Sequence, residues 1–376
     1  MAASTKPPTS RRATVRDVAD YAGVSMMTVS RVLNSRKGVE PTTRVRVEQA
    51  IGALEFTPNR AARDLASSRP LPTVAFKPPP KIAFVFDSPN TTFLGEMVSN
   101  GFDEAASANA QLVFIKTHAE DDPLLTVRSV SGLGIDGIIL SPPLCDDARL
   151  RLVLAEAGLR VVAIGCCDDD PAVSTIGVDD CRAAYEMTRY LIQLGHRRIG
   201  FILGHPRHGS SGRRRAGYEA ALLAHGIAPD RGLQWEGRYN FGSAIAAAEQ
   251  ALNLQPPITA LFASNDDMAA AVINVARARG VDVPRSLSVC GFDDSEIALM
   301  MFPQLTTVSQ PIAEMVRHGV RQLAAELHAL RRQTKPAIRK VLLDHTLTFR
   351  DSDAPPDKYG LDSSYQAAAN LGGCSK

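Results

Sequence analysis

The chain has 376 residues, enough for roughly two or three domains with buried cores. Its apolar content of 45% and charged content of 22% are ordinary for a globular protein. No stretch approaches the about 18 apolar residues that suggest a membrane-spanning helix. The net charge of +2 is uneven, because residues 1–69 carry 12 Lys and Arg against 6 Asp and Glu, and the remainder carries 30 against 34. A basic end on an acidic body indicates that only this end contacts a polyanion.

The six cysteines indicate neither a metal site nor a disulfide framework, because they show no C-x-x-C and no paired histidine spacing. Cys145, Cys166, Cys181 and Cys290 lie in or beside apolar runs, so we expect them to be small core residues. The first residues lack the apolar segment of a secretory signal. We therefore expect no metal, no cofactor, no membrane association and a cytoplasmic location.

The first predicted elements are three short helices within residues 14–58, after a disordered arm at 1–13. Thr14 and Asp17 form a T-x-x-D capping box, and Gly23 ends the first helix in the left-handed conformation that a tight turn requires. Ser25 can cap the second helix, and a third follows from about Thr43 to Leu54. Two helices joined by a glycine turn, with a third packed across them, predict a helix-turn-helix unit.

The second of these helices carries the side chains that would read a duplex. Its inward positions are valines, whereas Met27, Ser30 and Arg31 lie on the exposed face, with Met26 at the edge. In a major groove, Arg31 suits the O6 and N7 atoms of a guanine, and the methionines can only touch a thymine methyl or exclude water. The alternative is that these helices form a hairpin that packs against the rest of the chain.

Residues 59–67 predict a hinge helix whose order depends on a partner. Asn59 can cap it, but so short a helix is not stable alone in water, and this one is too polar to bury itself well. In a dimer, two copies of Leu65 can wedge into a minor-groove step and kink the duplex. The alternative for Leu65 is a loosely packed linker residue. Residues 68–80, rich in proline, are expected to be a linker.

The segments DVADYAGVSMMTVSRVLN and PNRAARDLAS together resemble the DNA-binding head and hinge helix of the LacI/GalR family of bacterial transcription regulators. Glu55 departs from the family, which usually has a glycine there, and the linker is longer and richer in proline than usual. The resemblance places the hinge residues at a minor groove. The candidate DNA-binding residues are Thr14, Ser25, Met26, Met27, Thr28, Ser30, Arg31, Asn34, Asn59, Ala62 and Leu65.

From residue 81 onward, short apolar runs alternate with helix-length segments. The runs are KIAFVF, LVFIK, GIILS, RVVAI, RIGFIL, ITALFA and LSVCGF. This alternation predicts parallel sheets covered by helices on both faces. A G-x-G-x-x-G motif over 132–137 precedes a strand instead of following one, so we do not interpret it as a dinucleotide site. His205 and His208 lack a third ligand at helix spacing and are interpreted as solvated loop residues.

The body also resembles the family, and through it the periplasmic sugar-binding fold. The motifs are YLIQLGHRRIGFILG, RRRAGYEAAL, ASNDDMAAAV, VCGFDDSE and PQLTTVSQP. The predicted fold is a small all-α head with a hinge helix, plus a two-lobed α/β effector domain of doubly wound parallel sheets. The expected N-terminal lobe is 81–165 and 310–339, and the C-terminal lobe is 166–309 and 340–350. Residues 351–376 are expected to be a disordered tail.

A ligand cleft is expected at the carboxyl ends of the strands, between the lobes. Arg and Asp suit the paired hydroxyls of a sugar, because their planar forks make two parallel hydrogen bonds. Arg214 matches the family arginine in R-x-x-G-[FWY], and Asn265 and Asp293 each follow a strand. The alternatives are a surface charge for Arg214 and a helix N-cap for Asp293. The secondary candidates are Asp87, Thr92, Phe93, and Tyr239 or Phe241 as an aromatic residue that stacks on the ligand.

The predicted function is a homodimeric repressor that leaves a pseudo-palindromic operator when a small carbohydrate-like effector binds the cleft. One alternative is a co-repressor-dependent regulator that binds DNA better when liganded, as the family's purine repressor does. A less favoured alternative is an α/β enzyme with a regulatory head, because no nucleophile–base pair, metal set or cofactor loop stands out. We expect no enzyme activity and a location at the bacterial nucleoid.

Overall fold

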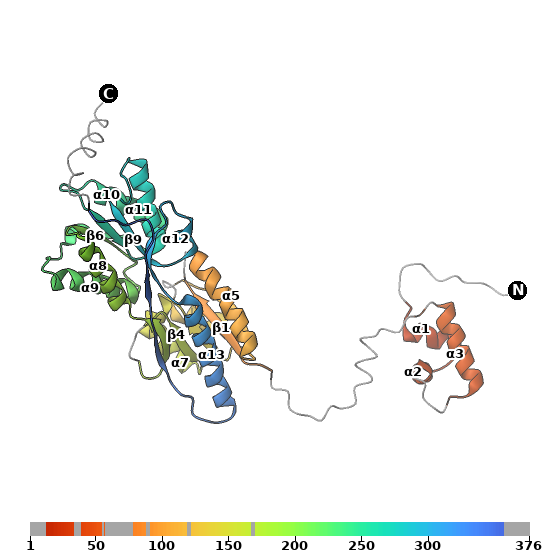
Figure 1. Ribbon diagram of the computed structural model, residues 1–376. Coiled ribbons are helices and arrows are strands. Elements are labelled where there is room, and N and C mark those ends of the chain that lie inside the picture. Colours follow the sequence, from red (N-terminus) through yellow and green to blue (C-terminus); the bar gives the residue numbers. More distant parts are fainter. Residues whose placement is uncertain are drawn as a thin grey trace. The chain divides into compact units, whose positions relative to one another are not determined.

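The structure is a computed structural model, and it falls into two compact units, a head within residues 1–77 and a body within 78–376 (Figure 1). The predicted hinge helix and the predicted DNA contacts Asn34, Asn59, Ala62 and Leu65 lie outside the described residues. So do the side chains of residues 91–93. The described ranges are 13–33, 39–54, 56, 78–87, 91–118, 122–166 and 170–356.

The head consists of three helices around one small core, as the sequence predicts. They are α1 (Val15–Ala22), α2 (Met26–Leu33) and α3 (Pro41–Ala53). Val18 of α1 and Val29 of α2 are fully buried in that core. α3 begins slightly earlier than expected, because the fixed φ of a proline suits the first turn of a helix.

Side-chain caps set the ends of the first two helices. The Thr14 Oγ1 accepts the Asp17 N–H at 3.3 Å, and the Asp17 carboxylate accepts the Thr14 N–H at 2.7 Å, which completes the expected capping box. Gly23 ends α1 with a φ of 63°. The Ser25 Oγ accepts the Thr28 N–H at 3.2 Å and caps α2. The turn between the two helices is therefore specified locally.

The N-terminal lobe of the body is built on one parallel sheet. Its strands are β1 (Lys81–Phe86), β2 (Gln111–Lys116), β3 (Gly137–Leu140), β4 (Arg160–Ile164), β5 (Ser174–Val178) and β11 (Lys340–Leu343). They form the order β11-β5-β4-β3-β1-β2. Its helices are α5 (Thr91–Ser107), α6 (Pro123–Ser131), η1 (Leu144–Asp146), α7 (Ala148–Glu156) and α13 (Ile312–Arg331).

Alternation along β1 shows how helices cover both faces of this sheet. Ile82 and Phe84 belong to a core shared with α5 and α13, whereas Ala83 and Val85 belong to a second core shared with α6 and α7. All four side chains are fully buried. A continuous apolar run such as KIAFVF is therefore a strand buried on both faces, which confirms the predicted doubly wound arrangement.

The C-terminal lobe repeats the design with a second sheet. Its strands are β6 (Ile199–Leu203), β7 (Gln234–Glu236), β8 (Ala260–Ala263), β9 (Ser288–Asp293), β10 (Thr306–Ser309) and β12 (Thr346–Thr348). Its helices are α8 (Asp180–Leu194), α9 (Gly209–Ala224), η2 (Arg231–Leu233), α10 (Phe241–Leu252), α11 (Asp266–Ala278) and α12 (Glu296–Met300). The sheet order is β12-β10-β9-β8-β6-β7, with β12 antiparallel to β10. Helices α10 and α11 cover one face, and α8 and α9 cover the other.

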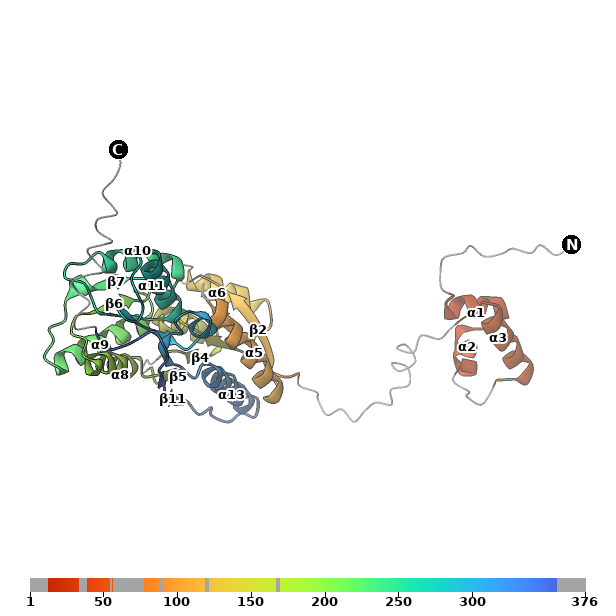
Figure 2. The same ribbon diagram turned by 45° about the horizontal axis from the view of Figure 1, so that its top comes forward.

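Two strands lie in a different lobe from the one expected. β5 and β11 pair in parallel with each other in the N-terminal sheet (Figure 2), although the sequence analysis places 166–309 and 340–350 in the C-terminal lobe. The run STIGV of β5 is fully buried but contains Ser, Thr and Gly, so it lacks the hydrophobic signal of the other strands. The chain therefore crosses between the lobes after β5, after β10 and after β11.

Residues 351–356 belong to the body instead of the expected disordered tail. Ser352 is fully buried, and its Oγ accepts the Thr306 N–H at 2.8 Å and donates to the Val289 carbonyl oxygen at 2.6 Å. These bonds fasten the segment to the neighbouring strands β9 and β10. Residues 357–376 lie outside the described chain. No helix among the described residues is long and apolar enough to cross a membrane.

Candidate functional site

A cavity of about 260 Å³ lies in the body and is lined by residues of both lobes. Asp87, which follows β1, and Gly165, which follows β4, come from the N-terminal lobe. Asn265, which follows β8, and Asp293, which ends β9, come from the C-terminal lobe. The cavity therefore lies at the carboxyl ends of strands in both sheets, where doubly wound folds bind their ligands.

Arg214 is a buried cation in the wall of this cavity. It is 5% exposed, and its Nε donates to the Asp180 Oδ1 at 2.8 Å. Its Nη1 donates to the Ser264 carbonyl oxygen and lies 3.7 Å from the Asp293 Oδ1. The guanidinium carbon is 3.5 Å from the centre of the Phe292 ring. Arg214 is thus held in a fixed orientation by carboxylates and an aromatic face, and it is not a surface charge.

Asp293 has a backbone conformation that few residues other than glycine adopt, with a φ of 116°, and it is followed by Asp294 at 58°. Its Oδ1 accepts a hydrogen bond from the Gln310 Nε2 at 2.6 Å. Burial raises the pKa of Asp293 to about 7, against the opposing effects of Arg214 and Gln310. The N-cap of α12 is Ser295, so neither aspartate is used as that cap and the alternative role for Asp293 is wrong.

Asn265 has two roles at the cavity. Its Oδ1 accepts the Met268 N–H at 3.0 Å and so caps α11, and its Nδ2 donates to the Tyr239 carbonyl oxygen at 3.3 Å. A primary amide has two N–H donors and two oxygen lone pairs. One donor and one lone pair therefore stay available for a ligand.

Tyr239 is the one Phe, Tyr or Trp side chain among the described residues that line the cavity. Its hydroxyl lies 2.9 Å from the Ser210 Oγ, and its ring centre lies 5.0 Å from that of His208. A Cβ at Gly204 would lie only 2.0 Å from the Tyr239 Cζ, so the glycine makes room for the ring. Burial raises the pKa of Tyr239 to about 12. Phe241, by contrast, begins α10, is 38% exposed and is not among the described residues that line the cavity.

Several lining residues are missed by the sequence analysis. His205 and His208 are half-buried in the cavity wall, whereas the sequence predicts solvated loop residues. Burial, followed by the charges of His205, Arg214 and Arg207, lowers the pKa of His208 to about 3, so its ring is neutral and offers one donor and one acceptor. Asp180 and Gln310 also line the cavity from segments where the chain crosses between lobes. The two histidines could have been predicted from their position just after β6, because Asn265 was predicted from its position just after a strand.

Of the remaining residues predicted to bind the effector, one lines the cavity and two have side chains that the structure does not describe. Asp87 lines the cavity, whereas Thr92 and Phe93 begin α5 with side chains outside the described residues. Gly165 has a φ of 75°, and a Cβ there would lie 2.8 Å from the Pro142 Cγ. A larger side chain at this position would therefore require Pro142 to move.

On the head, α2 presents the exposed face that the sequence predicts. Met26 is 54% exposed and Met27 is 67% exposed, and Ser30 and Arg31 are exposed beside them. Two large apolar side chains in water, next to an arginine, are typical of a surface that contacts a partner. Thr28 is half-buried and hydrogen-bonded to Ser25, with 3.0 Å between their hydroxyl oxygens.

Comparison with known proteins matches both units. The model of the bacterial regulatory proteins, lacI family, matches residues 14–59, and that of a periplasmic binding protein-like domain matches residues 188–352. The chain is 31% identical to the HTH-type transcriptional regulator DegA of Bacillus subtilis, over 92% of this chain and 99% of that protein. It is 34% identical to the HTH-type transcriptional regulator CelR of Thermobifida fusca, over 91% and 98%. Both are named as transcriptional regulators.

Solved structures agree with these matches. A complex of the transcriptional regulator CelR with cellobiose has a TM-score of 0.67 at 30% identity, and it covers 91% of this chain and 100% of that one. The lac repressor dimer bound to operator and the anti-inducer ONPF has a TM-score of 0.65 at 26% identity, with coverage of 92% and 100%. With its helix-turn-helix head and two-lobed body, this chain belongs to the lacI family of bacterial regulatory proteins and is a DNA-binding transcriptional regulator.

Proposed function

We propose that this regulator is a repressor that leaves a pseudo-palindromic operator when a small carbohydrate-like effector binds the interlobe cavity. The observation that carries the proposal is the set of groups on the cavity wall. Arg214 and Asp293 offer planar forks for vicinal hydroxyls, Asn265 offers an amide, and Tyr239 offers an aromatic face for sugar C–H groups. The volume of about 260 Å³ is near the lower end of the range for small-molecule sites.

The charges of the cavity favour an effector without net charge. Arg214 already has Asp180 at 2.8 Å and Asp293 at 3.7 Å, so its charge is balanced by the protein. His208 is neutral, because its pKa is lowered to about 3 by burial and the nearby cations. A charged ligand group at Arg214 would lose its hydration and would have to compete with Asp180 and Asp293. A neutral polyol avoids this cost, and cellobiose in the CelR complex is such a molecule.

We propose that the head binds DNA through the exposed face of α2. Met26, Met27, Ser30 and Arg31 would enter the major groove, with Ser25, Thr28 and Thr14 at its border. A homodimer supplies two such helices for a pseudo-palindromic site, as the lac repressor dimer bound to operator illustrates. Residues 59–67 would then contact the minor groove through Asn59, Ala62 and Leu65. Operator binding implies a location at the bacterial nucleoid, in the cytoplasm.

The proposed switch connects the cavity with the head. A ligand that contacts both Asp87 and Asp293 draws the two lobes together, because these residues come from different sheets. Movement of the N-terminal lobe changes the spacing of the segments that lead to the two heads of the dimer. A coupling free energy of roughly 1–3 kcal/mol corresponds to a change in operator affinity of about 5- to 150-fold.

The test is a titration of operator binding by the full-length protein with a panel of neutral sugars, uronates and purines. The operator is first recovered by selection from random duplexes. We expect a neutral mono- or disaccharide to weaken binding within the range above, and Asp293→Ala to retain operator binding but lose the response. Phe241→Ala, which changes an aromatic residue outside the described lining, is the matched control. A ligand that strengthens operator binding would replace the proposal with a co-repressor mechanism.

A further inference from the structure

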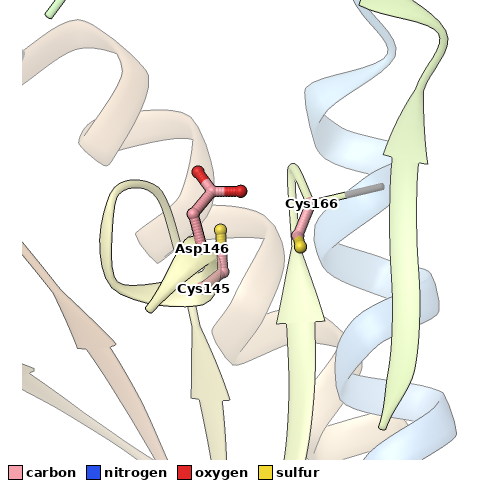
Figure 3. A group of neighbouring side chains, drawn as sticks. All are labelled: Cys145, Asp146 and Cys166. Carbon is pink, nitrogen blue, oxygen red and sulfur yellow. The ribbon is translucent and has the colours of Figure 1, made fainter. Parts of the chain in front are cut away.

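Two thiols and a carboxylate meet behind the N-terminal-lobe wall of the cavity. Cys145 and Asp146 lie in η1, which follows β3, and Cys166 lies just after β4. Their Sγ and carboxylate oxygen atoms all lie within 4.8 Å of one another. Figure 3 shows the three side chains gathered between the loops that leave these strands. We propose that this cluster, the Cys145–Asp146–Cys166 site, binds one divalent metal ion of the zinc class.

The donor set fits that class of ion. Zinc prefers thiolate, imidazole and carboxylate ligands in a tetrahedral arrangement, and three protein ligands leave a fourth position for water. With Zn–S bonds of about 2.3 Å, two sulfur ligands of a tetrahedral ion lie about 3.8 Å apart. The sulfur atoms, which lie within 4.8 Å of each other, therefore need to approach by at most about 1 Å. Hard ions such as Mg²⁺ and Ca²⁺ prefer oxygen ligands and fit this site poorly.

The protons and charges of the site balance when the ion binds. Without an ion, the Cys145 thiol is hydrogen-bonded to Cys166, and Cys166 is hydrogen-bonded to the Asp146 carboxylate. Two neutral thiols and one carboxylate have a net charge of −1. Binding of a divalent ion releases the two thiol protons to solvent, and the resulting complex also has a net charge of −1. The buried region therefore gains no net charge.

The neighbouring arginines do not prevent a metal ion from binding at this site. Arg213 influences both Cys145 and Asp146, but its guanidinium is 3.2 Å from the Asp180 carboxylate. Arg151 donates to the Cys145 carbonyl oxygen and lies 3.7 Å from the Asp170 carboxylate. Each arginine near the site thus has a carboxylate beside it, which reduces its repulsion of a metal ion.

Both loops that carry the Cys145–Asp146–Cys166 site also contribute residues to the wall of the interlobe cavity. Pro143, two residues before Cys145, and Gly165, next to Cys166, both line the cavity. The Asp146 Oδ2 accepts the Gly209 N–H at 2.9 Å and so links the site to α9 of the other lobe. A carboxylate oxygen of Asp146 also lies within 4.8 Å of both sulfur atoms. A bound metal would fasten these two loops and fix one wall of the cavity.

A spacing rule cannot find this site. Cys145 and Cys166 belong to no C-x-x-C motif, so neither a metal nor a cofactor is expected from the sequence. They meet because β3 and β4 are parallel neighbours, with Leu140 opposite Ala163, and their carboxyl ends therefore lie at the same edge of the sheet. Residues that follow adjacent parallel strands are close in space whatever their separation in sequence.

Cobalt titration of the full-length protein tests the proposal, after chelation and reduction and without sugar or DNA. We expect one equivalent of Co²⁺ to bind with a thiolate-to-cobalt charge-transfer band, and Zn²⁺ to remove that band. Cys145→Ser with Cys166→Ser should lose the band, whereas Cys181→Ser, which changes a half-buried cysteine outside the site, should keep it. Circular dichroism of each variant checks that it is folded.

Asp146→Asn provides a second test, because it keeps both thiols and an oxygen that can accept the Gly209 N–H. We expect the charge-transfer band to remain and the Co²⁺ affinity to fall. Three outcomes would overturn the proposal: no binding by the reduced wild-type protein, binding without the thiolate band, or equal binding by the double cysteine variant. A Cys145–Cys166 disulfide in a protein that binds no metal when reduced would show a redox pair instead. These readouts are independent of operator and sugar binding.

Discussion

The carboxyl group of Asp293 is buried, so its charged form is poorly solvated. Its carboxyl group lies between the Gln310 amide and the Arg214 guanidinium, and burial raises its pKa to about 7. Between about pH 4 and pH 7 the folded protein therefore binds a proton that the unfolded chain releases. The stabilisation from this proton is present below the unfolded pKa and is lost as the pH rises through about 7.

The first prediction is that Asp293→Asn flattens the pH dependence of stability. The amide does not titrate, so the free energy of unfolding of the variant should rise relative to wild type between about pH 5 and pH 8. Asparagine also tolerates the left-handed backbone at this position. The measurement is denaturant unfolding at both pH values, with Asp282→Asn at an exposed site as the control. Parallel profiles for Asp293→Asn and wild type would assign the titration to another group.

The second prediction concerns Arg31, on the exposed face of α2. If Arg31 binds a guanine edge, Arg31→Ala should cost roughly 1–3 kcal/mol at one position of each half-site and relax the base preference there. Affinities for operator variants at fixed salt measure this. Arg46→Ala removes the same charge from an exposed position on α3 and is the control. Uniform weakening for all sequences would show that Arg31 contacts phosphate.

The cavity shows how far individual residues follow from sequence. Asp87 and Asn265 are found because each follows an apolar strand, and Asp293 because it ends one; the carboxyl ends of parallel strands converge. The choice between Tyr239 and Phe241 could not be made, since it depends on the space left by Gly204, which is distant in sequence. The same holds for Asp180 and Gln310, because their positions depend on where the chain crosses between lobes.

At the scale of elements, strands made of large apolar residues are predictable, and β5 is not. Its Ser174 is fully buried, and its Oγ donates to the Glu326 Oε1 of α13 at 2.5 Å. The same carboxylate accepts hydrogen bonds from Arg160 of β4 at 2.6 Å and from Gln322 at 2.9 Å. A buried acid on a helix thus replaces the hydrophobic contact that an apolar strand would make. This compensation is long-range and leaves no local pattern.

The third prediction follows from this arrangement of α13, β4 and β5. Glu326→Ala removes the acceptor of the Ser174 hydroxyl and of the half-buried Arg160 guanidinium, and should lower the free energy of unfolding by roughly 3 kcal/mol. Glu326→Gln keeps an oxygen for Ser174 and should cost less. Denaturant unfolding followed by circular dichroism measures both variants. A loss of less than about 1 kcal/mol for Glu326→Ala would show that water replaces the carboxylate.

At the scale of the whole molecule, the cavity and the head belong to separate compact units, so any communication between them is a coupling free energy. The proposed switch requires an effector to weaken operator binding by some factor. Thermodynamic linkage then requires operator DNA to weaken effector binding by the same factor. This equality holds whatever the geometry of the connecting residues 57–77.

The fourth prediction is therefore reciprocal. Calorimetric affinity of the effector for the full-length protein should fall when saturating operator is present, by the factor measured in the reverse titration. A scrambled duplex of equal length is the control, because it retains phosphate contacts but lacks the specific site. Arg31→Ala should reduce the operator's effect, since less of the protein is held in its specific complex at the same DNA concentration. Effector affinity that operator leaves unchanged would mean that the cavity does not control DNA binding.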